Sequence, residues 1–201
     1  MGTLPIAFLF NADFMNVNMI LLGVSLLVSH YVAAFTPRWL APMLDDSYPV
    51  WTLTMLQQSD EVYDCGLEDE NREFCTDIVK YYNTEIEGRL LVIDGLVKKI
   101  ETTTVFSTST YSELQKNLRK DGFSLSKAMI SGQKFDVLKQ LECKTIDEVN
   151  RDFVRFLSAS RITDKRTFEW RPKTDYHSGE PSRWVQFSSD GKQITLRFIR
   201  K

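Results

Sequence analysis

Charge is missing from one long stretch near the start of this 201-residue sequence. Residues 14 to 37 contain no Asp, Glu, Lys or Arg, and the first basic residue of the chain is Arg38. Spanning a bilayer takes roughly 20 predominantly apolar residues, and a charge at the bilayer centre costs about 2.5 to 3.5 kcal/mol. We therefore predict a single transmembrane anchor over residues 14–37, after an N-terminal tail of residues 1–13.

A cleaved export signal is the alternative interpretation of the same segment. Val32, Ala33 and Ala34 place small residues after the apolar core, as signal peptidase requires, although no Lys or Arg precedes that core. The anchor predicts a single-pass protein of the cell (inner) membrane, whereas cleavage near Ala34 predicts a secreted or periplasmic protein. Both interpretations put the C-terminal domain outside the cytosol. A buried core helix of a soluble protein is the third interpretation.

Cysteine is scarce, with only Cys65, Cys75 and Cys143 in the chain. Cys65 and Cys75 flank a short polar segment, and such a pair forms a disulfide in an oxidising compartment. We predict this disulfide, which would stabilise the fold by about 2 to 3 kcal/mol in the chain-entropy model. Cys143 is left over, either as a small buried apolar residue or as a partner in an intermolecular disulfide. No second Cys or His lies at ligand spacing from any of the three, so we expect no metal site.

Residues that carry catalytic chemistry are also few. The chain has two histidines, His30 in the apolar segment and His177 in a polar loop that also holds Asp175. A nucleophilic hydrolase needs a base beside a Ser or Cys, and the sequence contains no phosphate-binding, dinucleotide-binding or HExxH zinc motif. We therefore expect neither enzyme activity nor a cofactor. His177 and Asp175 are a candidate pH-sensing or loop site, and an extracytoplasmic hydrolase would depend on this pair.

The charges that are present are balanced but unevenly spread. The formal net charge of -2 argues against a nucleic-acid partner, because nucleic-acid-binding domains are usually strongly basic. Residues 60–77 hold eight acids and one base, whereas residues 161–201 hold ten bases and five acids. Such runs are typical of solvated surface. The functional interpretation is an acidic loop that meets a basic partner, or the basic end of this chain.

Turn signals organise the polar remainder. Residues 38–49 include Pro42 and Pro49 and predict a stiff linker, followed by an extracytoplasmic domain over residues 50–201. Alternating side chains over residues 50–56 predict a first strand. The dipeptide Asp94-Gly95 joins two runs rich in β-branched and apolar residues and predicts a hairpin. A second Asp-Gly pair, Asp190-Gly191, predicts another hairpin near the C-terminus.

Capping signals predict helices between the two hairpins. Residues 110–113 fit a capping box that opens a helix as far as Lys120, with Gly122 just after its end. Residues 145–148 form a second box, which opens a helix with an apolar stripe. The stripe consists of Ile146, Val149, Phe153, Phe156 and Leu157. This order of elements predicts an α+β fold, with one antiparallel-sheet domain and helices packed on one face of the sheet.

A short N-terminal anchor followed by an α+β domain with a C-terminal hairpin resembles the architecture of the small periplasmic companions of membrane-bound bacterial transcription activators. The resemblance implies a protein partner, and it carries no residue-level motif. It favours a membrane-anchored extracytoplasmic protein-interaction or sensory and regulatory accessory module that is not catalytic. The alternatives are a binder of a small apolar ligand in a pocket between sheet and helices, and an extracytoplasmic hydrolase.

Overall fold

The structure is a computed structural model that describes residues 36–66 and 72–201. The N-terminal tail and residues 14–35 of the expected anchor lie outside the described residues, so the anchor and the export signal stay predictions. Among the helices of the two described ranges, none combines the length and the hydropathy that crossing a membrane requires.

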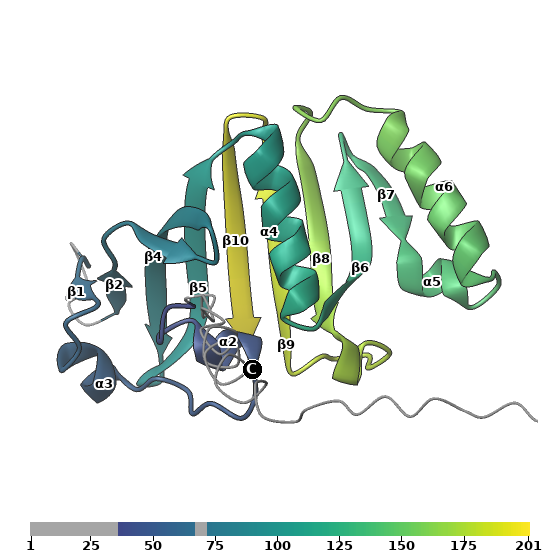
Figure 1. The fold of residues 1–201 in the computed structure, drawn as a ribbon. Coiled ribbons are helices and arrows are strands. Elements are labelled where there is room, and N and C mark those ends of the chain that lie inside the picture. Colours follow the sequence, from purple (N-terminus) through teal and green to yellow (C-terminus); the bar gives the residue numbers. More distant parts are fainter. Residues whose placement is uncertain (1–35, 67–71) are drawn as a thin grey trace, which may run out of the picture. The chain divides into compact units, whose positions relative to one another are not determined.

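One antiparallel sheet of ten strands dominates the described residues (Figure 1). Its strand order is β1-β2-β4-β5-β10-β9-β8-β6-β7, and β3 pairs with β4 beside this path. The strands are β1 (Tyr63–Asp64), β2 (Glu73–Cys75), β3 (Val79–Tyr81), β4 (Thr84–Ile93), β5 (Leu96–Val105), β6 (Phe123–Ile130), β7 (Gln133–Asp136), β8 (Arg166–Pro172), β9 (Arg183–Ser189) and β10 (Gln193–Arg200). The helices are α2 (Ala41–Leu44), α3 (Leu53–Gln57), α4 (Thr108–Lys120), α5 (Val137–Leu141), α6 (Ile146–Ser158) and the 3-10 turn η1 (Lys173–Asp175). The predicted α+β class with an antiparallel sheet is confirmed.

Both Asp-Gly hairpins form where the sequence predicts them. Asp94 and Gly95 adopt φ values of 53° and 75° between β4 and β5, as a two-residue turn with two left-handed positions requires. Gly191, with φ of 83°, lies in the turn between β9 and β10. A side chain at Gly191 would also collide with the carbonyl oxygen of Thr163, because an added Cβ would lie only 2.4 Å from it.

Helix α4 covers one face of the sheet (Figure 1). Tyr111, Leu114 and Leu118 are its buried apolar residues, and the Tyr111 ring lies 5.2 Å from that of Phe187 on β9. The helix begins earlier than predicted, because the Ser107 hydroxyl accepts the first cap hydrogen bond from the Thr110 backbone N–H. The prediction of a capping box at residues 110–113 was therefore wrong, because those residues lie inside the helix.

Helix α6 follows the second capping box, which is confirmed. The Thr145 hydroxyl accepts from the Glu148 backbone N–H, and the Glu148 carboxylate accepts from the Thr145 N–H. Its apolar stripe is only partly buried: Val149 is 1% exposed, whereas Ile146 is 57% exposed. The rings of Phe153 and Phe156 pack on Phe135 of β7. Phe135 pairs in register with the buried Ala128, so α6 lies on the same face of the sheet as α4.

Residues 50–56 do not form the predicted strand. Only Thr52 makes an isolated bridge, to Leu96, and α3 follows directly. The reason is local, because the Thr52 hydroxyl accepts a hydrogen bond from the Met55 N–H and caps a short helix.

The predicted linker contributes to the core. Trp39, Leu40 and Met43 are each at most 2% exposed, although they lie within residues 38–49. The Trp39 ring packs directly on the backbone of β4, since a Cβ added at Gly88 would lie 2.8 Å from its Cη2 atom. Residues 36–46 are therefore called the docked segment below. Its apolar side chains belong to the buried core cluster, so it differs from a stiff solvated connection.

Ion pairs hold both ends of the docked segment. Arg38 pairs with Glu61 and lies 3.8 Å from the Asp60 carboxylate. At the other end, Asp46 pairs with Arg183 at 2.8 Å and with Arg200 at 3.4 Å. The docked segment thus contacts the loop that follows α3 and the C-terminal hairpin at the same time.

Candidate binding face of the sheet

The candidate pair His177 and Asp175 is not brought together as a catalytic unit. Asp175 ends η1, and its Oδ2 atom accepts hydrogen bonds from the backbone N–H of Ser182 at 2.8 Å and from its hydroxyl at 3.0 Å. His177 is exposed, and its ring contacts that of Tyr176 with centroids 5.2 Å apart. Asp175 thus closes its own loop, and this geometry gives a hydrolase mechanism no support.

The cysteines divide as the spacing suggested. Cys65 and Cys75 lie at disulfide distance, with Cα atoms 5.8 Å apart, and they link the residue after the edge strand β1 to the last residue of β2. Cys143 is free and exposed, between α5 and α6. It is therefore not the small buried residue of one interpretation. Within residues 36–66 and 72–201, no group of three or more His, Cys, Asp or Glu side chains is arranged to hold a metal ion.

The face of the sheet opposite α4 is the largest part of the sheet that the described helices leave uncovered. Side chains alternate along each strand, so that Val185 and Phe187 of β9 point into the core while Trp184, Gln186 and Ser188 point to the other side. Both α4 and α6 lie on the core side. The opposite side is called the open face below, because none of the helices described above packs on it.

A continuous row of charged and polar side chains crosses the open face. The strands are paired in register, so each residue of the row faces its neighbour directly across the strand boundary. From β4 to β7 the row reads Arg89, Glu101, Arg197, Gln186, Glu169, Lys127 and Asp136. We call it the charged row.

Two carboxylates of the charged row are held in place by their neighbours. Glu101 accepts from the Arg197 Nε atom at 2.6 Å and lies 3.8 Å from the Lys99 ammonium group. Glu169 accepts from the Ser126 hydroxyl at 3.0 Å and from the Arg171 Nε atom at 2.8 Å. These contacts order the acids without burying them, so their charges remain available at the surface.

A second row lies beside the charged row and is mostly hydroxyl-bearing. Its members are paired across the same seven strands. From β4 to β7 it reads Glu87, Thr103, Thr195, Ser188, Thr167, Met129 and Lys134. Only its two ends are charged. We call it the hydroxyl row.

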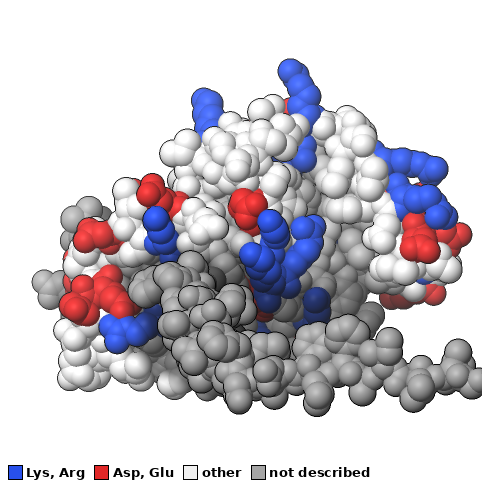
Figure 2. Space-filling view, in the orientation of Figure 1, with Lys and Arg blue, Asp and Glu red and all other residues white. Residues whose placement is uncertain are grey.

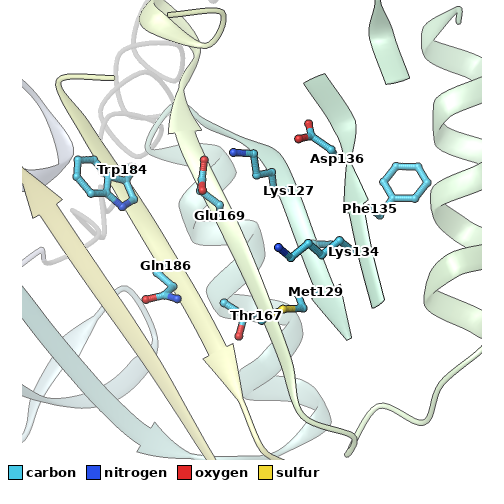
Figure 3. Close-up of a pocket in the computed structure, with 10 residues that line it drawn as sticks. Lys127, Met129, Lys134, Phe135, Asp136, Thr167, Glu169, Trp184 and Gln186 are labelled. Atoms are coloured by element: carbon cyan, nitrogen blue, oxygen red, sulfur yellow. The ribbon is translucent and has the colours of Figure 1, made fainter. Parts of the chain in front are cut away.

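A shallow pocket of about 410 Å³ lies on the open face over β9, β8, β6 and β7. Figure 3 shows Trp184, Gln186, Glu169 and Lys127 projecting from neighbouring strands, while Phe135 points away toward α6. Two lysines and two acids line the pocket with the half-buried Trp184. A Trp in such a polar setting is typical of protein interfaces, where an aromatic anchor is surrounded by polar contacts.

The helix-covered face offers a less persuasive site. Figure 2 shows Lys and Arg side chains gathered near the C-terminal half of α4, whose last turn holds Arg119 and Lys120. Arg119 lies over the Trp170 ring at 5.3 Å, and Lys120 lies over the Tyr82 ring at 5.1 Å. Cations at this position also interact favourably with the helix dipole. These contacts give the basic cluster a structural role.

A buried carboxyl lies just beyond the same helix. Asp121 follows α4 and accepts hydrogen bonds from the hydroxyls of both Tyr81 and Tyr82. Burial raises the pKa of Asp121, although the two phenol hydrogen bonds act in the opposite direction. Burial and the Asp121 carboxylate raise the pKa of both tyrosines. This cluster joins the β3–β4 turn to the end of α4. Asp121 also lines a pocket of about 420 Å³ with Lys120, Lys173 and Arg183, but both of its carboxylate oxygens already accept hydrogen bonds from the two phenols.

The open face was not identified in the sequence analysis. The signal was present within single strands, for example in the alternation of Glu85, Glu87 and Arg89 with apolar residues and Gly88. The two rows, however, exist only when seven strands are placed in register.

The chain matches no protein-family model, and comparisons with curated proteins and with solved structures give no match.

Proposed function

We propose that this chain is a membrane-anchored, extracytoplasmic protein-interaction module that is not catalytic, and that it binds its protein partner through the open face of the sheet. The observation that carries the proposal is the exposed, ordered surface formed by the charged row, the hydroxyl row and Trp184.

Two features support the location outside the cytosol. The uncharged run over residues 14–37 has the length of a membrane span. The Cys65–Cys75 pair lies at disulfide distance, and structural disulfides persist in oxidising compartments. If an export peptidase cut near Ala34 instead, the docked segment with Trp39 would remain on the domain.

The composition of the open face favours a protein partner over a small apolar ligand. The pocket on this face is lined by Lys127, Lys134, Asp136 and Glu169, and a small apolar ligand would leave these charges without a match. Nor does the pocket lie between sheet and helices. Acidic and basic groups alternate along the charged row on each side of Gln186, which provides specificity for a surface with the opposite pattern.

Site-specific photo-crosslinking of the full chain in its native membrane tests this proposal. A photoreactive amino acid replaces Thr167 on the open face, and Lys116 on the outer side of α4 serves as the matched control. We expect adducts with protein from position 167 and none from position 116. Equal adducts from both positions, or none from either, would contradict the proposal.

A further inference from the structure

The signs of the charges in the charged row are reversed on the two sides of its central residue, and the ion pairs within the sheet do not require this arrangement. Gln186 on β9 is its central member, with three charged residues on each side. Counting outward, the pairs are Arg197 and Glu169, then Glu101 and Lys127, then Arg89 and Asp136. Each pair consists of one positive and one negative side chain, so the row changes sign about its centre.

Alternation of charge within one sheet does not explain this sign change. If the charges alternated regularly across all seven strands, positions at equal distances from the centre would carry the same sign. Instead, the residues on either side of the uncharged Gln186 carry opposite charges, so a positive side chain on one side lies at the same distance from Gln186 as a negative one on the other. The hydroxyl row repeats the pattern, because Glu87 and Lys134 lie at equal distances from Ser188.

A surface whose charges change sign about a line is complementary to itself under a two-fold rotation around that line. An axis along β9, parallel to the sheet, would lay Arg197 of one copy over Glu169 of the other and Glu101 over Lys127. The rotation also preserves the right-handed twist, so the two faces stay roughly parallel. We propose that the open face binds a second copy of this chain, and that β9 lies on the two-fold axis.

The dimensions of the face agree with such a contact. Seven strands at a spacing of about 4.8 Å span roughly 30 Å, and six residues of strand span about 20 Å. A patch of that size covers on the order of 600 Å² per copy, at the lower end of specific interfaces. Two chains tethered to one membrane meet at a raised effective concentration, which favours a contact of this size. The inference thus rests on the proposed function.

Charge reversal at the ends of the hydroxyl row tests the pairing. Glu87 and Lys134 are exposed, and neither makes an ion pair within the described ranges. In the full chain reconstituted in lipid nanodiscs or detergent, Glu87→Lys or Lys134→Glu alone should weaken dimerisation by about tenfold, because each substitution places like charges together twice in a symmetric dimer. The double variant should restore the dimer. If the double variant instead dimerised more weakly than either single variant, so that the two losses in affinity added up, the inference would be overturned.

Thiol cross-linking tests the position of the axis in a Cys143→Ser background. Gln186→Cys should cross-link to itself with a short bis-maleimide, because the axis passes beside it. Glu87→Cys and Lys134→Cys should each stay monomeric when alone and cross-link when the two chains are mixed. Lack of these cross-links, with photo-adducts from position 167 to a different protein, would overturn the second-copy inference and leave the proposed function standing. Lack of any adduct or cross-link would overturn both.

Discussion

Gly88 makes room for the docked segment because its side chain is a single hydrogen atom. Its neighbours on β4 carry side chains, whereas the Trp39 ring occupies the place that a side chain at position 88 would take. The same site contains unpartnered polar atoms, since the Trp39 indole N–H and the Thr102 hydroxyl are buried without a hydrogen-bond partner in the described structure. Leaving such groups unpaired costs about 1 to 3 kcal/mol each. Apolar packing, the ion pairs at its two ends and a hydrogen bond from the Arg200 guanidinium to the Pro42 carbonyl oxygen hold the docked segment in place.

Gly88→Ala should destabilise the fold. The added Cβ would lie 2.8 Å from Trp39 Cη2 and 3.2 Å from Thr76 Cγ2, so the indole must shift within a packed core. We expect a loss of about 1 to 3 kcal/mol in the free energy of unfolding, measured by urea titration. Gly179→Ala is the matched control, because nothing lies within 4 Å of its Cβ position. Equal stability of the two variants would show that Trp39 does not pack on β4.

Asp121 makes stability depend on pH in a defined direction. Its folded-state pKa is raised, mainly by burial, so its contribution to stability is fully present below the unfolded pKa, near 3.8, and is lost as the pH rises through the folded value. Asp121→Asn removes this titration. In urea titrations, the wild-type chain should lose stability relative to the variant as the pH rises above about 4. A constant or an increasing advantage of the wild type over that window would contradict the burial argument.

At the scale of elements, the β1–β2 corner depends on the Cys65–Cys75 link. β1 has two residues and β2 has three, so few backbone hydrogen bonds hold this edge of the sheet. The disulfide closes the acidic loop, of which residues 67–71 lie outside the described ranges. It thus provides much of the local constraint on the open-face side, where Cys75 pairs with Arg89 of the charged row.

Replacing both Cys65 and Cys75 by Ser should lower stability by about 2 to 3 kcal/mol in the chain-entropy model. Urea titration of the oxidised chain and of the double variant measures the difference. Cys143→Ser is the control and should change nothing, because that thiol is free and exposed. If the double variant matched the wild type, the pair would be reduced in the native protein, and the extracytoplasmic location would lose one of its two supports.

The elements that neighbouring residues specify were predictable from the sequence. The Asp94-Gly95 turn and the Thr145 capping box need only side chains a few positions apart, and both form as expected. Where two local signals compete, the prediction was wrong: the alternation over residues 50–56 lost to the cap that Thr52 provides for α3. Trp39 could not be placed, because its burial depends on Gly88 of β4, far along the chain.

The candidate site was less predictable than the fold. The disulfide was anticipated from spacing and compartment, because a short polar loop can close on itself. His177 and Asp175 were chosen for their chemistry, yet the Asp175 carboxylate is used by Ser182. The charged row depends on strand order and register over seven strands, and a single sequence does not specify either.

At the scale of the whole molecule, the chain separates a packing side from a presenting side. The helices α4 and α6, together with the docked segment, pack on one face of the sheet, and the large buried side chains lie there. The other face presents fixed charges, hydroxyls and Trp184. This division predicts that substitutions on the two sides have different effects: core-side changes reduce stability, and open-face changes alter association.

Thiol footprinting of the open face is the most direct test of that division. Gln186→Cys and Lys116→Cys are each introduced into the full chain with Cys143→Ser, and maleimide labelling rates are compared between native membranes and dilute purified chain. Cys at position 186 should label much more slowly in the membrane than when purified, whereas Cys at position 116 should label at the same rate in both. Equal rates at position 186 in the two settings would contradict the account, because the open face would then have no partner in its native surroundings.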